Sequence, residues 1–352
     1  MRTFVATLSG MSLLLLTACG GKLPGFRVDE KTDSFVQASS TTGNTVDLLF
    51  IVDNSGSMAD EQAAMAASFE DFITKFSAKD LDFRIGIVAT DNRENSTWWT
   101  NIYTNNGIDH DGPGSLLTKY PAYRWLSPST PDLVAKFQAN VQLGTVGSGY
   151  EMPLSTFTKA ITTKAAAGQW NEGFVRSAAY FAAIIVTDED EHVDVGDNNY
   201  VYDADQTEMN TRLSTLRTSM TDLKGSTDKF GVWAITAPSV AQCPTAFGIG
   251  EAVMLAAQQN GGSVGNICSA FSDTLLEIGD SILSAATRFK LLQPPDGSME
   301  VVVNGEIVPQ DTSRQNGWDY LAASQEVEFY GSYIPVAGAS INVNYIPASP
   351  NE

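Results

Sequence analysis

The stretch LLFIVDNSGSM, from Leu48 to Met58, decides how the fold of this chain is predicted. It begins with five apolar residues, a run typical of a strand buried on both faces, and then changes abruptly to small oxygen-bearing side chains. Asp53 follows the apolar run directly, and Ser55 and Ser57 are spaced so that their hydroxyls can point the same way. Ligands of open α/β sheets bind beyond the carboxyl ends of the strands, which is where Asp53 stands.

One carboxylate and two hydroxyls at a strand end predict a site for a divalent cation. These hard oxygen donors suit Mg²⁺ better than a soft metal, with Mn²⁺ or Ca²⁺ as alternatives. The simpler interpretation is a capped turn, since Gly56 permits a tight turn and Ser57 stands where a helix N-cap belongs. The buried strand before the motif and the helical pattern after it favour the metal site. An EF-hand is excluded, because its required glycine and glutamate are replaced by Met58 and Ala64.

The composition bounds the class of protein. The chain has 352 residues, which favours one large domain and a smaller one, and a hydrophobic share of 43% is enough for a proper core. With 41 acidic and 21 basic residues the formal net charge is -20, which argues against nucleic acid as a partner, because a phosphate backbone requires a basic surface.

The first residues form a targeting segment. Arg2 precedes an apolar stretch that ends at Leu16 and is too short to span a bilayer, and the sequence LTAC leads from there to Cys19. This end resembles a bacterial lipoprotein signal, which implies cleavage after residue 18 and a lipid anchor on Cys19. We therefore expect a chain anchored to a membrane of the cell envelope, at the outer membrane and facing the periplasm or the cell surface. An ordinary secretory signal is the alternative.

Cys243 and Cys268 are the two remaining cysteines. Outside the cytoplasm two thiols are readily oxidised, so we predict a disulfide between them, with two buried free thiols as the alternative. Closing this loop would stabilise the fold by about 3–4 kcal/mol through the lost entropy of the unfolded chain.

The pattern of apolar residues predicts four parts: a signal peptide (1–18), a tether (19–45), an α/β domain (46–288) and a C-terminal β module (289–352). Apolar runs predict strands at 46–53, 83–90, 181–188 and 229–238. Helical periodicity predicts helices at 58–78, 149–166, 207–223, 247–259 and 270–287. This alternation predicts an α/β fold with a doubly wound, mostly parallel sheet and helices on both faces. Alternation at period two after residue 288 predicts a small all-β module.

Two further segments carry oxygen-bearing side chains that a family resemblance adds to the first motif. Asp188 ends the apolar strand of IIVTDEDE, and the turn LGTVGSGYEMPL offers the hydroxyl of Thr145, with that of Ser148 as the alternative. Together with DNSGS, these segments resemble the metal-ion-dependent adhesion site of the von Willebrand factor type A domain, and more narrowly a group of bacterial lipoproteins of that family. The acidic residues 189–191 are expected in a solvated loop or helix start, with a second cation site as the alternative.

The resemblance implies a role for each residue of the site. Ser55 and Ser57 are expected to bind the ion directly, and Thr145 to bind it from a loop that moves. Asp53 is expected to coordinate the ion or to orient its waters, and Asp188 to act through water. One coordination position stays open for an Asp or Glu side chain of a protein partner.

The predicted function is metal-dependent recognition or adhesion, and not catalysis. An envelope-structural protein, whose metal site stabilises the fold or an assembly, is the alternative. The sequence GGSVG at 261–265 has the pattern of a serine hydrolase, but a helical stretch precedes it and both histidines, His110 and His192, lie before its serine. The sequence also contains no Gly-x-x-x-x-Gly-Lys-Ser/Thr phosphate-binding loop.

Overall fold

A computed structural model describes most of the chain. The described residues are 31–36, 45–78, 81–194, 200–201, 207–336 and 339–348. The predicted signal peptide and the predicted lipid attachment site at Cys19 lie outside these ranges. Within them, no helix is both long enough and apolar enough to cross a membrane.

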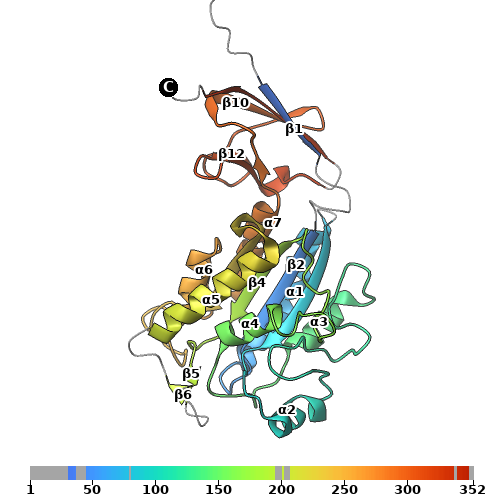
Figure 1. Ribbon diagram of the computed structural model, residues 1–352, viewed down its shortest axis with the longest axis vertical. Coiled ribbons are helices and arrows are strands. Elements are labelled where there is room, and N and C mark those ends of the chain that lie inside the picture. Colours follow the sequence, from blue (N-terminus) through green and yellow to red (C-terminus); the bar gives the residue numbers. More distant parts are fainter. Residues whose placement is uncertain are drawn as a thin grey trace, which may run out of the picture.

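A five-stranded parallel sheet forms the centre of the α/β part, with the strand order β3-β2-β4-β7-β8 (Figure 1). The bounds are β2 Thr45–Val52, β3 Asp82–Ala89, β4 Tyr180–Val186, β7 Phe230–Thr236 and β8 Val264–Asn266. Every residue of β2 is buried, and parallel strands covered on both faces are read in the sequence as continuous apolar runs.

Alternate residues of β2 point into two separate apolar clusters, because successive side chains of a strand face opposite ways. The surrounding helices are α1 Ala59–Ser77, α3 Leu133–Val141, α4 Pro153–Ile161, α5 Thr207–Lys224, α6 Glu251–Gln259 and α7 Phe271–Ala286. Phe50 packs in the cluster that contains α1, α3 and α7, whereas Ile51 packs in the cluster that contains α4, α5 and α6. Phe69 of α1 stacks on Phe137 of α3 with ring centroids 3.5 Å apart. Packing on both sides therefore fixes the strand that carries Asp53 at its end.

Two short helices lie in the long connection after β3: α2 (Ser96–Ile102) and the 3-10 helix η1 (Thr104–Asn106). Trp99 is buried there and stacks on Tyr103 with ring centroids 4.4 Å apart. The Tyr103 hydroxyl accepts a hydrogen bond from Asn54 Nδ2 (3.0 Å). This connection therefore packs against the DNSGS turn and supports it.

The remaining strands are antiparallel. A four-stranded sheet has the order β1-β14-β10-β11, a three-stranded sheet has the order β12-β13-β9, and β5 pairs with β6. Their bounds are β1 Lys31–Val36, β5 Val193–Asp194, β6 Tyr200–Val201, β9 Phe289–Lys290, β10 Pro295–Val303, β11 Glu306–Val308, β12 Gly317–Leu321, β13 Glu326–Tyr330 and β14 Ser340–Pro347. Two further 3-10 helices, η2 and η3, span Thr227–Lys229 and Gly331–Tyr333.

The predicted fold class, a doubly wound and mostly parallel sheet with a small C-terminal β module, is wrong. The described residues have a mixed α/β architecture in which five of fourteen strands form the parallel sheet and the other nine are antiparallel. Moreover, β1 lies in the N-terminal part of the chain and pairs with β14 in the C-terminal part. The register runs from Lys31 opposite Tyr345 to Val36 opposite Ser340. Apolar periodicity reports which residues are buried and not which strands pair, so it could not reveal this sheet.

The segment predicted as a tether (19–45) thus includes seven residues of folded sheets, namely the six of β1 and Thr45, the first residue of β2. The four-part division of the chain is otherwise still a prediction. The three-stranded sheet starts at Phe289, the residue at which we expect the β module to begin.

Asp33 of β1 ties the N-terminal strand to the C-terminal sheet. Its buried Oδ2 accepts hydrogen bonds from the Tyr345 hydroxyl (2.6 Å) and from the backbone N–H of Leu292 (2.8 Å). We expect Asp33→Ala to lower the free energy of unfolding by about 2 kcal/mol, because the buried Tyr345 hydroxyl and the partly buried N–H of Leu292 lose their acceptor. Urea unfolding followed by fluorescence measures this change.

The control variant is Ser34→Ala, because Ser34 neighbours Asp33 on the same strand and is exposed. This change should alter the free energy of unfolding by less than about 0.5 kcal/mol. Equal unfolding midpoints for the two variants would contradict the role given to Asp33.

Candidate metal-binding site

Three neighbouring strands bring the predicted site together at one edge of the parallel sheet. β3, β2 and β4 lie side by side, and the residues that directly follow them are Thr90, Asp53 and Thr187. The backbone N–H of Asp53 donates to Val186 O (2.9 Å), and that of Thr90 donates to Val52 O (3.2 Å). The strand ends are therefore hydrogen-bonded to each other, and the side chains that follow them share one place.

Asp53 is fully buried and is the centre of this arrangement. Its Oδ1 accepts a hydrogen bond from the backbone N–H of Ser55 (2.7 Å), and its Oδ2 accepts one from the Thr187 hydroxyl (2.7 Å). The hydroxyls of Ser55 and Ser57 lie 3.1 Å apart, and that of Ser57 donates to Asp188 Oδ1 (2.9 Å). The structure thus brings together four of the five predicted site residues.

The fifth predicted residue, Thr145, lies on a loop that touches the motif without completing it. The backbone N–H of Gly147 donates to Asn54 O (2.9 Å), which holds this loop against the DNSGS turn. Thr145 itself is half-buried, and within the described ranges its hydroxyl makes no hydrogen bond to the motif. Ser148 is buried, and its Oγ accepts a hydrogen bond from the backbone of Tyr150 (3.0 Å). The choice between Thr145 and Ser148 as second-loop ligand therefore stays a prediction.

The acidic run after Asp188 is not a solvated loop, so that expectation is wrong. Glu189 and Glu191 are buried, and Asp190 is partly buried. Asp190 Oδ1 accepts a hydrogen bond from the backbone of Ala252 (2.9 Å) in the first turn of α6. Glu191 Oε2 accepts one from the backbone of Leu154 (2.6 Å) in the first turn of α4. Two of these carboxylates therefore satisfy helix N-termini, where negative charge is stabilising.

Glu151 is a residue of this site that the sequence analysis missed. It is fully buried, its Oε2 accepts a hydrogen bond from the Thr90 hydroxyl, and its Oε1 has no hydrogen-bond partner. Its backbone also joins the second loop to the third, since His192 N–H donates to Glu151 O (2.6 Å) and Glu151 N–H donates to His192 Nδ1 (3.2 Å). The feature of the sequence that could have indicated Glu151 is its position two residues before Pro153, where α4 begins with an apolar first turn.

Burial and the charges of neighbouring acids raise the pKa values of Asp53 and Glu189. Burial raises the pKa of Asp53 to about 6, although hydrogen bonds from Ser55 and Thr187 act in the opposite direction. Burial, and then the charges of Asp53 and Asp188, raise the pKa of Glu189 to about 8. In the described part of the chain, no basic side chain forms an ion pair with Asp53, Asp188 or Glu189. The site therefore places three carboxyl groups close together without a cationic partner.

These side chains fit a hard divalent cation. The donors at the edge are carboxylate and hydroxyl oxygens, which suit Mg²⁺, whereas Zn²⁺ prefers histidine and cysteine. The carboxylate of Glu189 adds a buried Oε2 without a hydrogen-bond partner. Among the described residues, no three His, Cys, Asp or Glu side chains are grouped so that they alone could hold a metal ion. An ion at this edge would therefore depend on the hydroxyls of Ser55 and Ser57 as well as on the carboxylates.

The predicted disulfide between Cys243 and Cys268 is confirmed, and its Cα atoms lie 5.3 Å apart. Cys243 belongs to the loop after β7, and the same loop reaches the site. The backbone N–H of Phe247 donates to Asp188 Oδ2 (3.3 Å), and that of Gly248 donates to Asp188 O (2.9 Å). The disulfide therefore constrains a loop that holds Asp188 in place.

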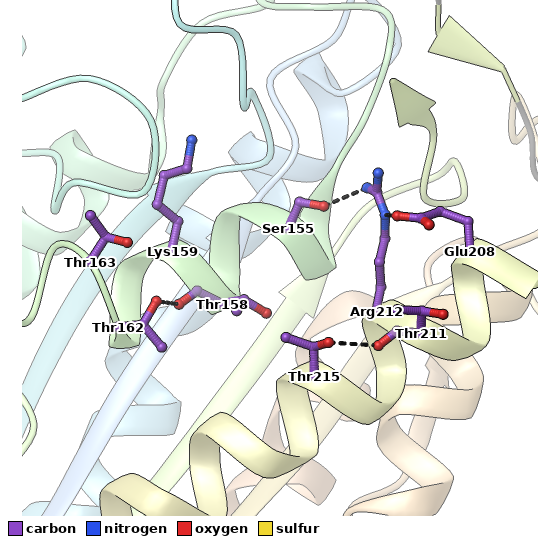
Figure 2. Close-up of a pocket in the computed structure, with 9 residues that line it drawn as sticks. All are labelled: Ser155, Thr158, Lys159, Thr162, Thr163, Glu208, Thr211, Arg212 and Thr215. Carbon is purple, nitrogen blue, oxygen red and sulfur yellow. Dashed lines mark hydrogen bonds and ion pairs between the residues drawn. The ribbon is translucent and has the colours of Figure 1, made fainter. Parts of the chain in front are cut away.

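A polar groove of about 390 Å³ lies between α4 and α5 and is lined mainly by threonines (Figure 2). The hydroxyls of Thr158 and Thr211 donate to backbone carbonyls one turn earlier in their own helices. Arg212 pairs with Glu191 (2.6 Å) and with Glu208 (3.2 Å). Since these donors already have partners, the groove is a weaker candidate than the edge of the sheet.

The similarity of the chain to known proteins is remote. No protein-family model and no curated protein matches it. Among solved structures, the pilus adhesin SpaC from Lactobacillus rhamnosus GG, in its open conformation, has a TM-score of 0.39 and 12% identity over 90% of this chain and 42% of SpaC. Proximal thread matrix protein 1 from the mussel byssus has a TM-score of 0.40 and 9% identity over 72% of this chain and 50% of that protein. The chain thus spans half or less of the length of these two proteins.

Arg212 has two acidic partners of different burial, and we expect them to differ in their contribution to stability. The Glu191 side chain is 0% exposed and that of Glu208 is 50% exposed. Glu191→Ala should lower the free energy of unfolding by about 3–5 kcal/mol, because it leaves the mostly buried Arg212 without its buried partner. Glu208→Ala should lower it by less than about 1 kcal/mol, because an exposed ion pair contributes little.

Urea unfolding of both variants beside the unaltered chain measures the two changes. Similar losses of stability for Glu191→Ala and Glu208→Ala would contradict a buried structural role for Glu191.

Proposed function

We propose that this chain is an envelope protein that recognises an acidic group of a protein partner through a divalent cation at the edge of its parallel sheet. The main support is the chain of oxygens that runs from Asp53 through Ser55 and Ser57 to Asp188, in a site of buried negative charge without a basic partner. We also propose a relationship to the von Willebrand factor type A family, on these site motifs and not on the overall architecture.

Several residues of the site would together bind Mg²⁺, with Mn²⁺ or Ca²⁺ as alternatives. Ser55 and Ser57 would bind through their hydroxyls, and Thr145 or Ser148 would add a hydroxyl from the second loop. Asp53 is held by hydrogen bonds to both of its oxygens, so it is positioned to orient the site rather than to move. When bound, the ion supplies a positive centre to which a carboxylate of the partner can bind. Ser57 is exposed, so the site is accessible from solvent.

The proposed location follows from the first residues of the chain. A lipid on Cys19 would hold the chain at the outer membrane, facing the periplasm or the surface. We propose a binding role without enzyme activity, because the proposed site offers ligands for a cation, and its acids Asp53, Asp190 and Glu191 are held by hydrogen bonds.

Asp53→Asn tests the metal site, because it removes one negative charge and keeps the shape of the side chain. In EDTA we expect the variant to be at least as stable as the unaltered chain, since the replaced charge lies beside Asp188. In Mg²⁺ at a hundredfold excess over Kd, the unaltered chain should gain about 2.7 kcal/mol in free energy of unfolding, and the variant should gain almost nothing.

Calorimetric titration of Mg²⁺ and Mn²⁺ and unfolding curves in each buffer measure these effects. Ser77→Ala is the control, because Ser77 is an exposed serine at the end of α1, and it should bind Mg²⁺ normally. If the unaltered chain binds neither ion, the motif is only a capped turn. If EDTA unfolds the chain completely, the structural alternative is favoured over recognition.

A further inference from the structure

Exposed apolar side chains lie on the two loops that contact the proposed metal site. Of the nine large apolar side chains that are exposed among the described residues, five lie between Leu292 and Ile346, and the other four come from these two loops. They are Val146 (56% exposed), Tyr150 (47%), Val240 (67%) and Phe247 (73%), and we call these four residues the apolar rim. Single exposed apolar residues are ordinary, but a group of them on loops that share one site marks an interaction surface.

The two loops approach the site from opposite sides of the sheet edge. The loop with Val146 and Tyr150 lies on the β3 side, because Met152 N–H, at its end, donates to Thr90 O (3.1 Å). The loop with Val240 and Phe247 continues from β7, on the far side of β4. Asp53 and Asp188 follow β2 and β4, which lie between β3 and β7 in the sheet. The rim therefore flanks the site on two sides.

Backbone contacts hold Val146 and Phe247 of the rim close to the motif. Gly147, the neighbour of Val146, binds Asn54 O, and Phe247 donates its own N–H to Asp188 Oδ2 (3.3 Å). The ring of Tyr150 meets the ring of His192 edge-on, with centroids 5.6 Å apart. Phe247 thus binds the acidic centre with its backbone while most of its side chain stays exposed to solvent.

Charge restricts what can cover this rim. The chain has a formal net charge of -20, so an acidic partner is repelled except at a bound cation. Contacts around that single attraction must then come from apolar surface, which does not depend on charge. On the basis of the proposed function, we propose that the apolar rim receives apolar or aromatic side chains on both sides of the partner's metal-bound Asp or Glu.

The test is a selection of random peptides displayed on phage against the full chain, once in Mg²⁺ and once in EDTA. A selected peptide is then labelled, and its binding to the unaltered chain, to Phe247→Ser and to Ile307→Ser is titrated by fluorescence anisotropy. Ile307 is the matched control, because it is 67% exposed and lies on β11, in the antiparallel sheet. Calorimetry with Mg²⁺ alone accompanies each variant.

We expect peptides that share an acidic residue with apolar neighbours on both sides and that bind in Mg²⁺ but not in EDTA. Phe247→Ser should weaken peptide binding by about tenfold or more, as loss of a central aromatic contact does, and should leave the affinity for Mg²⁺ unchanged. Ile307→Ser should change neither.

Two outcomes would overturn the role of the apolar rim and leave the proposed function standing. In the first, the selected peptides bind in Mg²⁺ through an acidic residue that has no apolar neighbours. In the second, the peptides bind Phe247→Ser as well as they bind the unaltered chain. The absence of Mg²⁺ binding, or equal peptide binding in EDTA, would overturn the proposed function and the rim with it. If no peptide is enriched while Mg²⁺ still binds, the rim proposal fails. Mg²⁺-dependent self-association that Phe247→Ser abolishes would assign the surface to a second copy of the chain and would also overturn it.

Discussion

The buried carboxylate of Asp53 is the constraint on which the rest of the structure depends. Moving an ionised carboxylate from water into the protein interior costs roughly several kcal/mol, unless hydrogen bonds and an opposite charge offset the lost hydration. Ser55 and Thr187 supply the hydrogen bonds, but the nearest charges are those of other acids, and the pKa of Asp53 is raised to about 6, chiefly by burial. Two apolar clusters fix β2 from both sides, so the strand cannot turn this residue toward solvent. The packing thus holds an unfavourable charge in place, which is typical of a functional site.

Four acidic residues in a row have four different environments. Asp188 binds Ser57, Asp190 and Glu191 satisfy the first turns of α6 and α4, and Glu189 keeps a buried oxygen without a partner. A sequence that looks like one solvated acidic run is therefore a junction where two helices and the third segment of the site are tied together. Mutating any of these acids would test structure and function together, which is why Glu191 is compared with Glu208, the other acidic partner of Arg212.

The sequence predicted local structure well and long-range structure poorly. The apolar run before Asp53 and the helix after it were recognisable, because both patterns depend only on neighbouring residues. The pairing of Lys31–Val36 with the last strand was not recognisable, because a strand does not record its partner, and the predicted fold class failed for that reason. Asp53, Ser55 and Ser57 could be placed at the site because ligands bind beyond the carboxyl ends of such strands, whereas Asp188 was added by the resemblance to the von Willebrand factor type A site. Glu151 was missed because its closeness to Thr90 depends on how a long connection returns to the sheet.

The loop after β7 holds a residue of the site in place and also exposes apolar side chains to solvent, and these two roles usually conflict. Its backbone at Phe247 and Gly248 must stay fixed to hold Asp188, yet the side chains of Val240 and Phe247 are exposed, and exposed loops tend to be mobile. The disulfide from Cys243 to Cys268 removes this conflict, since it fixes the loop by a covalent bond instead of by burying its apolar side chains. An apolar side chain that is fixed while exposed loses little further freedom when a partner covers it. The same bond that positions an acidic residue of the site therefore also prepares the surface beside it for binding.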